Sequence, residues 1–375
     1  MTRTRVAPVF AVVTGGGTAG HVLPALAIAE GLTERGHATS EIHYIGARRG
    51  FETKLLPPTG YPYTLLPVTG LQRRLTPKNL VMAFRLAGAV VTAWRLLGRI
   101  RPKVVVSVGG YASLPAVLAA RLRRIPVVVV SYDKRPGRAS KLAARFAAAC
   151  AVAFDGVDLP RARPTGAPLR RAVLRLDPAH DRVDARDVLG LPGDRYVIAV
   201  TGGSQGSGAL NGAVAGFVAA HADRSDLAVR HVVGERFLDR ASPARDGAHG
   251  ILYQVIGYEE RLPLVYVASD LVVGRAGAGT VCEVSAIGVA SLLVPWAGAA
   301  EDHQTDNART LSDVGAAILV PEGEFTAERL GAEVDALIAD PARRRVMAAA
   351  ARAAGERHRS SSLVDLIEEV ADGPR

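Results

Sequence analysis

The sequence has little cysteine and no pattern of residues typical of a metal site. Its 375 residues include two cysteines, Cys150 and Cys282, which form neither a metal-binding nor a redox motif. No cluster of carboxylates, histidines or cysteines suggests a metal ion, and no Asp-x-Asp motif occurs. We therefore expect no metal and no cofactor, and this cysteine usage fits a reducing cytosol.

Long apolar runs are also missing. No run approaches the roughly 18 residues that span a bilayer. The first residues, 1–6, lead directly into an expected strand instead of into a separate apolar segment. We therefore expect neither a membrane-spanning helix nor a signal peptide, and we expect a cytoplasmic location.

Charge is distributed unevenly along the chain. Residues 1–165 hold 24 Lys or Arg against 7 Asp or Glu, whereas residues 166–375 hold 22 against 29. A basic first half favours an anionic partner, which is a nucleic acid, an anionic membrane surface or a phosphate-bearing substrate. No nucleic-acid recognition motif is present, so we expect no nucleic acid among the partners.

Short apolar runs alternate with Ala- and Leu-rich stretches, and this alternation predicts parallel βαβ units. The pattern restarts near residue 195, which predicts an α/β chain of two Rossmann-like, doubly wound domains. The prolines of 159–164 suit a linker, so we place the boundary between residues 163 and 164. The expected strands are 9–13, 43–45, 104–108, 127–130, 196–200, 229–233, 271–273 and 291–294, and the expected helices include 24–35, 114–124, 210–221 and 280–287.

Two glycine-rich turns follow expected strands, at Thr14–His21 and at Thr201–Gly208. Glycine permits a close backbone approach, and the helix that follows offers unpaired N–H groups and a positive dipole end. Each turn alone is equally well explained as a tight turn. Two turns at corresponding places in two halves favour a pair of anion sites at the carboxyl ends of the strands.

Other phosphate-binding motifs fit the first turn less well. His21-Val22 stands where a Walker motif requires Lys-Ser or Lys-Thr. The spacing Gly15-x-Gly17-x-x-Gly20 matches a dinucleotide fingerprint, but no acidic residue follows the second strand. Arg48 and Arg49 stand there and suit a 2′-phosphate, so a dehydrogenase remains an alternative, as does a UDP-sugar epimerase of related architecture.

Five motifs occur in order along the chain. They are Gly16-Gly-Thr-Ala-Gly-His21 with Pro24, Gly109-Gly-Tyr111 with Pro115, Thr201-Gly-Gly-Ser-Gln-Gly206 with Asn211, Arg275-Ala-Gly-Ala-Gly-Thr-Val-Cys-Glu283, and Asp302-His-Gln-Thr-Asp-Asn307. Together they resemble one family, the MurG glycosyltransferases, which move GlcNAc from UDP-GlcNAc onto lipid I, and the resemblance covers nearly the whole chain. It implies a GT-B fold whose two domains face each other across a cleft, a donor site mainly in the domain formed by 164–357, and a last helix that returns residues 358–375 to the domain formed by 1–163.

The resemblance assigns UDP-GlcNAc to the second half. It implies that Glu283 holds the ribose diol, which suits a carboxylate acceptor, and that Gln304 reads sugar hydroxyls while Asn307 supports its loop. Taken singly, these residues would be read as ordinary polar surface positions. The donor-binding candidates are Arg170, Ser204, Gln205, Glu259, Ala278, Gly279, Thr280, Glu283, Gln304 and Asn307; the uracil is expected to meet the backbone near Tyr258 and Glu259.

The first half is expected to take the lipid-linked diphosphate acceptor. His21 is the candidate general base because an imidazole titrates near ~6.5, although binding the acceptor diphosphate or supporting the loop are alternative roles. Asp133 is the other catalytic candidate. We expect inverting transfer without a metal, in which helix N-termini and cations stabilise the departing UDP. The acceptor-binding candidates are Gly16, Gly17, Thr18, Ala19, Gly20 and Tyr111.

One segment departs from the family. Ser131–Lys134 stands where the family has His-Glu-Gln-Asn, and Ala167-Pro168 replaces its Asn-Pro. Three hypotheses follow: the family's own activity with Tyr132 or Asp133 as replacements, a paralogous UDP-sugar transferase with another acceptor, or a non-catalytic protein that binds nucleotide sugar or lipid diphosphate.

Lipid I lies in the membrane, so the resemblance implies a peripheral contact with an anionic surface on the inner face. Residues 71–84 mix cations with apolar residues, and the loop 70–80 is the stronger candidate. For most of 85–98 we expect an ordinary helix whose apolar face joins the core.

Overall fold

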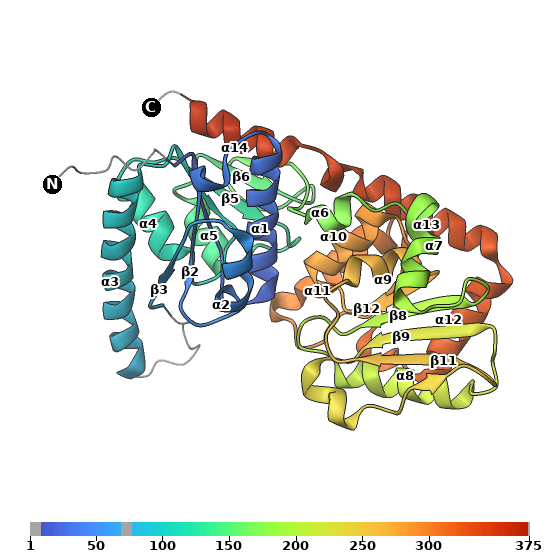
Figure 1. The fold of residues 1–375 in the computed structure, drawn as a ribbon. Helices are drawn as coiled ribbons and strands as arrows, with labels where there is room; N and C mark the ends of the chain where they lie inside the picture. The colour runs from blue at the N-terminus through green and yellow to red at the C-terminus, as the bar shows by residue number, and fades with distance from the viewer. Residues whose placement is uncertain (1–8, 69–76, 374–375) are drawn as a thin grey trace. The chain divides into compact units, whose positions relative to one another are not determined.

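A computed structural model describes residues 9–68 and 77–373. The chain divides into two compact units, one formed by Met1–Arg171 with Ser360–Arg375 and the other by Ala172–Arg359. The second unit is thus an insertion between two parts of the first (Figure 1). Each unit is built on its own seven-stranded sheet.

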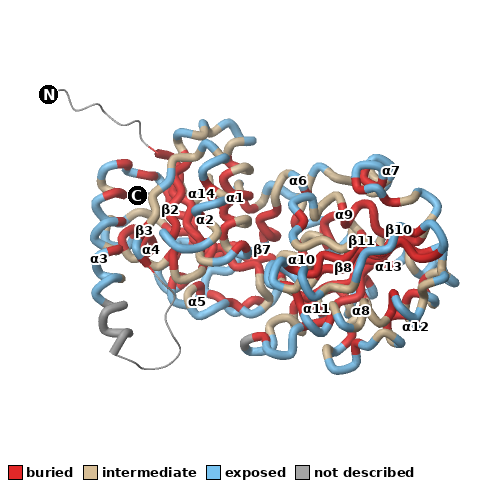
Figure 2. Tube along the Cα trace, turned by 60° about the horizontal axis from the view of Figure 1, so that its bottom comes forward, coloured by how far each residue is buried: buried red, intermediate tan, exposed pale blue. Residues whose placement is uncertain are grey.

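The sheet of the first unit is parallel throughout, in the order β3-β2-β1-β4-β5-β6-β7. Its central strands are runs of valine and alanine with almost no exposure, as expected where helices cover both faces of a parallel sheet (Figure 2). The strands are β1 (Ala11–Thr14), β2 (Ile42–Ala47), β3 (Tyr63–Leu66), β4 (Val104–Ser107), β5 (Val127–Ser131), β6 (Ala149–Val152) and β7 (Ala162–Pro164).

Helices of the first unit include one from the far end of the chain. That helix, α14, packs against α1 and against β4, β5 and β6. Gly31 of α1 permits the close approach, because a Cβ there would lie 2.9 Å from Val364. The helices are α1 (Ala19–Glu34), α2 (Glu52–Leu55), α3 (Pro77–Ile100), α4 (Leu114–Leu122), α5 (Arg138–Ala144) and α14 (Ser362–Asp372), with 3-10 turns η1 (Thr39–Glu41) and η2 (Pro57–Thr59).

The sheet of the second unit has the order β10-β11-β9-β8-β12-β13-β14, and only β10 runs antiparallel to its neighbour. Its core is a separate cluster of apolar side chains from the sheet and its covering helices. The strands are β8 (Tyr196–Thr201), β9 (Leu227–Val232), β10 (Arg245–Asp246), β11 (Leu252–Ile256), β12 (Leu271–Gly274), β13 (Ser291–Leu293) and β14 (Ala317–Leu319).

Local signals set the helix ends of this unit. Asp177 caps α7 by accepting from the N–H of Ala179, Pro178 begins the helix, and Gly190 ends it with φ +63°. The helices are α6 (Arg171–Leu174, at the unit boundary), α7 (Pro178–Leu189), α8 (Gly208–Ala220), α9 (Leu262–Ala268), α10 (Ala278–Ile287), α11 (His303–Ser312), α12 (Ala327–Ala339) and α13 (Pro341–Gly355), with η3 (Glu235–Arg240), η4 (Ala300–Asp302), η5 (Glu322–Glu324) and η6 (Glu356–Arg359).

Two expectations need correction. The linker expected at 159–164 is wrong, because residues 162–164 form β7, which pairs with β6 and completes the first sheet. The first helix begins at Ala19 instead of at residue 24, so Pro24 lies inside α1. The loop 70–80 falls mostly outside the described residues.

Candidate functional site

The structure divides the predicted site residues between the two units. The first unit holds Gly16, Gly17, Thr18, Ala19, Gly20, His21, Tyr111, Asp133 and Arg170, and the second holds Ser204, Gln205, Glu259, Ala278, Gly279, Thr280, Glu283, Gln304 and Asn307. We refer to residues 15–20 as the first glycine loop and to residues 202–206 as the second glycine loop.

The first glycine loop connects β1 to α1 and packs tightly against a second pair of glycines. A Cβ at Gly110 would lie 2.6 Å from the carbonyl oxygen of Gly16 and 3.4 Å from Cγ of His21. Gly17 has φ +94°, and a Cβ there would lie 2.6 Å from the Tyr111 ring. The loop therefore depends on glycine for both its conformation and its close contacts.

A buried carboxylate holds this loop from behind. One oxygen of Glu52, Oε1, accepts from the N–H of Gly17 at 3.0 Å and from the N–H of Ala47 at 2.9 Å. Glu52 is fully buried, and its other oxygen, Oε2, has no partner in the described part of the chain. A Cβ at Gly16 or Gly50 would overlap the carboxylate, so these glycines leave room for it.

Sequence reasoning missed Glu52. It lies 35 residues from Gly17, and only the fold brings the two together. The available signal was local: Gly46 and Gly50 stand close to this acidic residue in Gly46-Ala-Arg-Arg-Gly-Phe-Glu52.

His21 lies half-buried in the first turn of α1, with its Nδ1 3.0 Å from Oγ1 of Thr18. Burial lowers the pKa of His21, and the negative charges of Asp133 and Glu52 act in the opposite direction. The Tyr132 hydroxyl is also near, 3.7 Å from the position of a Cβ at Gly20. The structure thus brings His21, Asp133 and Tyr132 into one neighbourhood at the first glycine loop.

The second glycine loop connects β8 to α8 and is open on its outer side. Gly203 has φ +77°, and a Cβ there would meet nothing within 4 Å. Ser204 and Gln205 are exposed, and in the described residues neither their side chains nor their N–H groups donate to a protein acceptor. Free N–H groups beside a helix N-terminus are the usual donors to phosphate.

A buried arginine supports this loop. Arg275 donates to Oγ of Ser207 at 2.7 Å, and Ser207 in turn caps α8 by accepting from the N–H of Leu210. The same guanidinium forms an ion pair with Glu322. The sequence motif contained Arg275 but gave it no role; its position after the buried strand β12 was the available signal.

Helix α10 offers a second set of backbone donors. It begins at Ala278, so the N–H groups of Ala278, Gly279 and Thr280 have no acceptor within the helix. Glu283 follows one turn later and is half-buried, and burial raises its pKa to about 7. In the described residues no side chain or N–H group is hydrogen-bonded to this carboxyl group.

Gln304 and Asn307 lie on α11 and bind neighbouring backbone. Gln304 Oε1 accepts from the N–H of Trp296 at 2.9 Å. Asn307 is fully buried and donates from Nδ2 to the carbonyl of Ala276 at 3.2 Å, which connects α11 to the turn before α10.

Two donor candidates have side chains that are already engaged. Glu259 is buried against Arg230, and although burial acts to raise the pKa of Glu259, the bonds from Arg230 and from the N–H of Arg261 lower it. Arg170 lies in the first unit, not in the unit expected to bind the donor, and pairs with Glu30 of α1 at 2.6 Å. The expected placement of Arg170 in the donor domain is therefore wrong.

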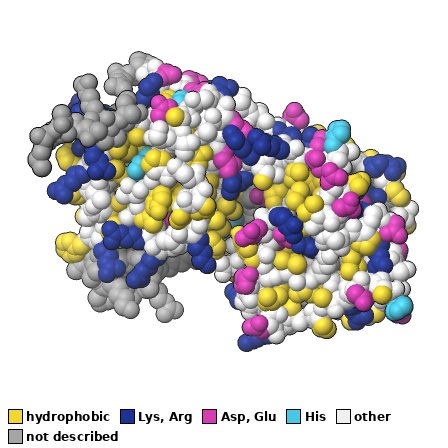
Figure 3. All heavy atoms as spheres, in the orientation of Figure 1, with side chains coloured by type: hydrophobic (Ala, Val, Ile, Leu, Met, Phe, Trp, Pro, Cys, Tyr) yellow, Lys and Arg dark blue, Asp and Glu magenta, His cyan; other side chains and the backbone are white. Residues whose placement is uncertain are grey.

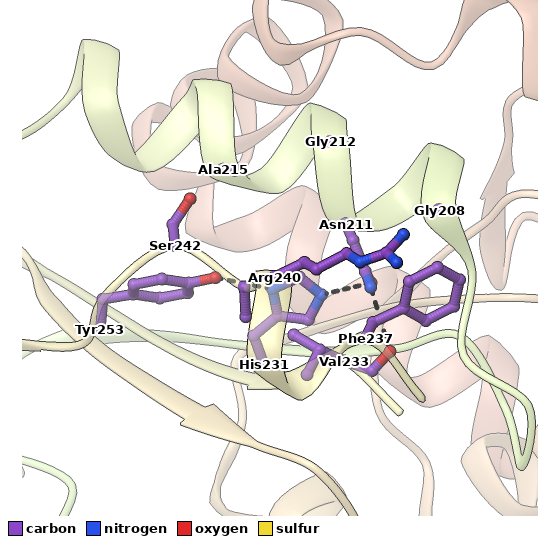
Figure 4. Close-up of a pocket in the computed structure, with 11 residues that line it drawn as sticks. Gly208, Asn211, Gly212, Ala215, His231, Val233, Phe237, Arg240, Ser242 and Tyr253 are labelled. Carbon is purple, nitrogen blue, oxygen red and sulfur yellow. Dashed lines mark hydrogen bonds between the residues drawn. The ribbon is translucent and has the colours of Figure 1, made fainter. Parts of the chain in front are cut away.

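A cavity of about 220 Å³ lies beside α8 in the second unit (Figure 4). Its wall contains a chain of buried polar groups: the Tyr253 hydroxyl lies 2.9 Å from His231 Nδ1, and His231 Nε2 lies 3.0 Å from Oδ1 of Asn211. Because an amide oxygen only accepts, Nε2 carries the proton and Nδ1 accepts from Tyr253. Asn211 then donates to the carbonyl of Val233, so the chain connects β11, β9 and α8.

Neither a metal-binding cluster nor a membrane-spanning helix is found in the described residues. Within 9–68 and 77–373, no three His, Cys, Asp or Glu side chains gather as metal ligands would. No described helix combines the length and apolar character needed to cross a bilayer.

Comparison with known proteins gives the family. Residues 11–152 match the glycosyltransferase family 28 N-terminal domain, and residues 197–367 match its C-terminal domain. Proteins named UDP-N-acetylglucosamine–N-acetylmuramyl-(pentapeptide) pyrophosphoryl-undecaprenol N-acetylglucosamine transferase are similar over nearly their whole length. The one from Desulforudis audaxviator is 38% identical, covering 96% of this chain and 98% of its own, and the one from a Nocardioides species is 39% identical, covering 96% and 97%.

Solved structures give the same fold. The crystal structure of Acinetobacter baumannii MurG superposes with a TM-score of 0.71 at 27% identity, covering 98% of this chain and all of that one. A UDP-GlcNAc 2-epimerase from Neisseria meningitidis has a TM-score of 0.65 at 14% identity, covering 96% of this chain and 99% of that one, which shows a shared fold alone.

The expected GT-B fold of two Rossmann-like units is confirmed, and the dehydrogenase and epimerase alternatives are set aside. The chain belongs to glycosyltransferase family 28 and, within it, to the MurG family of UDP-GlcNAc-dependent transferases.

Proposed function

We propose that the chain transfers GlcNAc from UDP-GlcNAc to the MurNAc 4-hydroxyl of undecaprenyl-diphospho-MurNAc-pentapeptide, lipid I, and so forms lipid II. The observation that carries this proposal is the similarity, over nearly the whole chain, to transferases that bear this activity in their names. The two glycine loops and the first turn of α10 supply the kinds of groups that such a reaction needs.

The second unit binds the donor in this proposal. The free N–H groups of Ser204 and Gln205 and those of the first turn of α10 hold the diphosphate. The unpartnered Glu283 carboxylate accepts from the two ribose hydroxyls. The same backbone donors stabilise the negative charge that develops on the departing UDP, and this requires no metal ion.

The first unit binds the acceptor and removes its proton. The acceptor oxygen attacks C1 of GlcNAc while the bond from C1 to the diphosphate oxygen breaks, and UDP leaves with that electron pair. His21 takes the hydroxyl proton on Nε2. This requires the tautomer in which Nδ1–H donates to Thr18 Oγ1, because Nε2 is then free to accept. Asp133 stabilises the imidazolium that forms.

A second candidate function is transfer from a UDP-sugar to a different acceptor. One observation favours it: Ser131–Lys134 differs at every position from the His-Glu-Gln-Asn expected from the family resemblance. This segment begins at the last residue of β5, and its Tyr132 and Asp133 lie near the first glycine loop and His21, on the acceptor side of the proposed site.

The test is an assay of purified protein with UDP-GlcNAc and a lipid I analogue in the presence of EDTA. We expect GlcNAc transfer with inversion at C1, and activity unchanged by the chelator. Turnover only with other acceptors would support the second function. Binding of UDP-GlcNAc with no turnover on any acceptor would indicate a non-catalytic protein. Loss of activity in EDTA that Mg²⁺ restores would contradict metal-independent transfer.

We also propose that the first unit rests on an anionic membrane surface. Helix α3 buries one face in the core, through Ala89, Ala93 and Leu97. Its other face presents Phe84, which is 72% exposed, and then Val91 and Arg95 at helical spacing. Figure 3 shows apolar and basic side chains interspersed on the visible face of this unit.

Liposome pelleting tests this contact. The protein is expected to bind vesicles that contain anionic lipid, and binding should weaken as salt screens the charges. Phe84→Ser should reduce binding, whereas Val183→Ser, which changes an apolar residue of the second unit that is 69% exposed, should not. Equal loss in both variants, or binding that is insensitive to salt, would refute an electrostatic contact through α3.

A further inference from the structure

One of the two tryptophans of the chain, Trp296, is solvent-exposed and lies next to the donor-binding candidate Gln304. Trp296 lies in the turn after β13 and is 50% exposed. A Cβ at Gly298 would lie 2.8 Å from the indole ring, so the ring rests over this glycine. The core does not explain the position of this side chain, because half of its surface meets solvent.

The turn that carries Trp296 is fixed on both sides. Its N–H groups are bound by side chains: Trp296 N–H donates to Gln304, and Ala297 N–H donates to Glu322 at 2.9 Å. Arg275 donates to the carbonyls of Val294 and Pro295, each at 3.2 Å. An aromatic ring held in this way loses little conformational freedom when a ligand packs on it.

The same groups connect Trp296 to the proposed donor site. Arg275 also bonds Ser207, which follows the second glycine loop directly. Gln304, the residue assigned to the sugar hydroxyls, holds the backbone N–H of Trp296 itself. The turn that carries the indole is therefore hydrogen-bonded to Gln304, the sugar candidate, and through Arg275 to the residue that follows the second glycine loop.

We propose that the exposed face of the Trp296 indole is the platform against which the apolar face of the donor sugar packs. This rests on the proposed function, because it assigns a sugar contact within that donor site. A pyranose ring has one face rich in C–H groups, and burying them against an indole gives affinity for the sugar that UDP alone lacks.

Fluorescence offers a direct test, because Trp94 is the only other tryptophan. In full-length Trp94→Phe, all tryptophan emission comes from Trp296. We expect saturable addition of UDP-GlcNAc to change this emission, and UDP at saturation to change it much less. UDP-GlcNAc that binds by calorimetry and leaves the emission unchanged would overturn the platform. Failure of both nucleotides to bind would instead refute the proposed donor site.

Binding by two variants separates a sugar contact from a structural role. Trp296→Ala should weaken UDP-GlcNAc binding by about tenfold and leave the Kd of UDP unchanged. Trp296→Phe should recover most of the lost affinity, because it restores an aromatic face. An equal loss of affinity for UDP and UDP-GlcNAc in Trp296→Ala, with recovery in neither assay by Trp296→Phe, would show that the residue only supports the turn.

Discussion

The two glycine loops look alike in the sequence, yet their surroundings have opposite charge. Each loop follows a buried strand and precedes a helix. The first has a buried glutamate behind it, and Glu52 accepts the N–H of Gly17. The second has a buried arginine behind it, and Arg275 donates to the residue that caps the next helix.

This difference assigns different chemistry to the two loops. A phosphate near the first loop would meet the field of Glu52 and would find the Gly17 N–H already bonded. The second loop has free N–H groups and a nearby guanidinium, although Glu322 compensates part of that charge. The second loop is thus better suited to the donor diphosphate. The first loop is better suited to holding His21. The negative charges of Asp133 and Glu52 stabilise the protonated imidazole that forms when His21 accepts a proton as a base.

The largest expected effect comes from removing the hydrogen-bond acceptor behind the first glycine loop. Glu52→Ala leaves the N–H groups of Gly17 and Ala47 without their acceptor in a buried site. We expect a loss of about 3–4 kcal/mol in the free energy of unfolding, with GlcNAc transfer strongly reduced. Chemical denaturation and the transfer assay measure the two effects.

Glu52→Gln is the matched control, because its amide oxygen still accepts both bonds. Loss of the negative charge lowers the pKa of His21 further, so the acid limb of kcat/KM should move to lower pH. Asp133→Asn should move it further, since Asp133 has the larger electrostatic effect on His21. An acid limb that stays in place in both variants would exclude His21 as the base.

A smaller effect is expected at Arg275. Arg275→Lys keeps the charge but loses the planar fork that reaches Ser207, Val294 and Glu322 together. We expect UDP binding to weaken by roughly tenfold to a hundredfold, corresponding to about 1.4–2.8 kcal/mol. Calorimetry with UDP measures this. If the folded variant binds UDP with unaltered affinity, Arg275 does not contribute to UDP binding at the second glycine loop.

The same substitution in both loops compares their packing directly. Gly17→Ala and Gly203→Ala each place a side chain at positive φ, which costs about 1–2 kcal/mol. Gly17→Ala also drives a Cβ against the Tyr111 ring, whereas Gly203→Ala meets nothing within 4 Å. Chemical denaturation should therefore show a larger loss in the free energy of unfolding for Gly17→Ala. Equal losses for the two variants would mean that the Tyr111 ring moves aside at no measurable cost.

The smallest effect is a pH dependence of donor binding. Glu283 has a pKa of about 7 because it is desolvated, so its charged form is lost as pH falls through 7. In the proposed function the ionised carboxylate binds the ribose diol, so UDP-GlcNAc should bind about threefold to tenfold more weakly at pH 6 than at pH 8. Glu283→Gln should bind weakly at both values. A wild-type Kd that is constant from pH 6 to pH 8 would contradict the ribose role.

The sequence predicted the architecture where the pattern was strong. Buried runs such as Val104–Ser107 and Val127–Ser131 can hardly form anything but central strands. Strand β7 was missed because Ala162–Pro164 is a short, exposed edge segment that includes a proline. The groups behind the loops were missed for another reason. Glu52–Gly17 and Arg275–Ser207 are bonds between residues 35 and 68 positions apart, and no local spacing encodes them.

The return of α14 to the first unit has a consequence for the order of events during synthesis. Its contacts with β4, β5 and β6 cannot form until the entire second unit has left the ribosome. The ion pair of Arg35 with Asp365 likewise forms only after Asp365, 330 residues later in the chain, has been synthesised. The second unit of this transferase is therefore complete as a folding unit while the unit that holds His21 still lacks α14. A nascent chain gains its proposed base-bearing unit last.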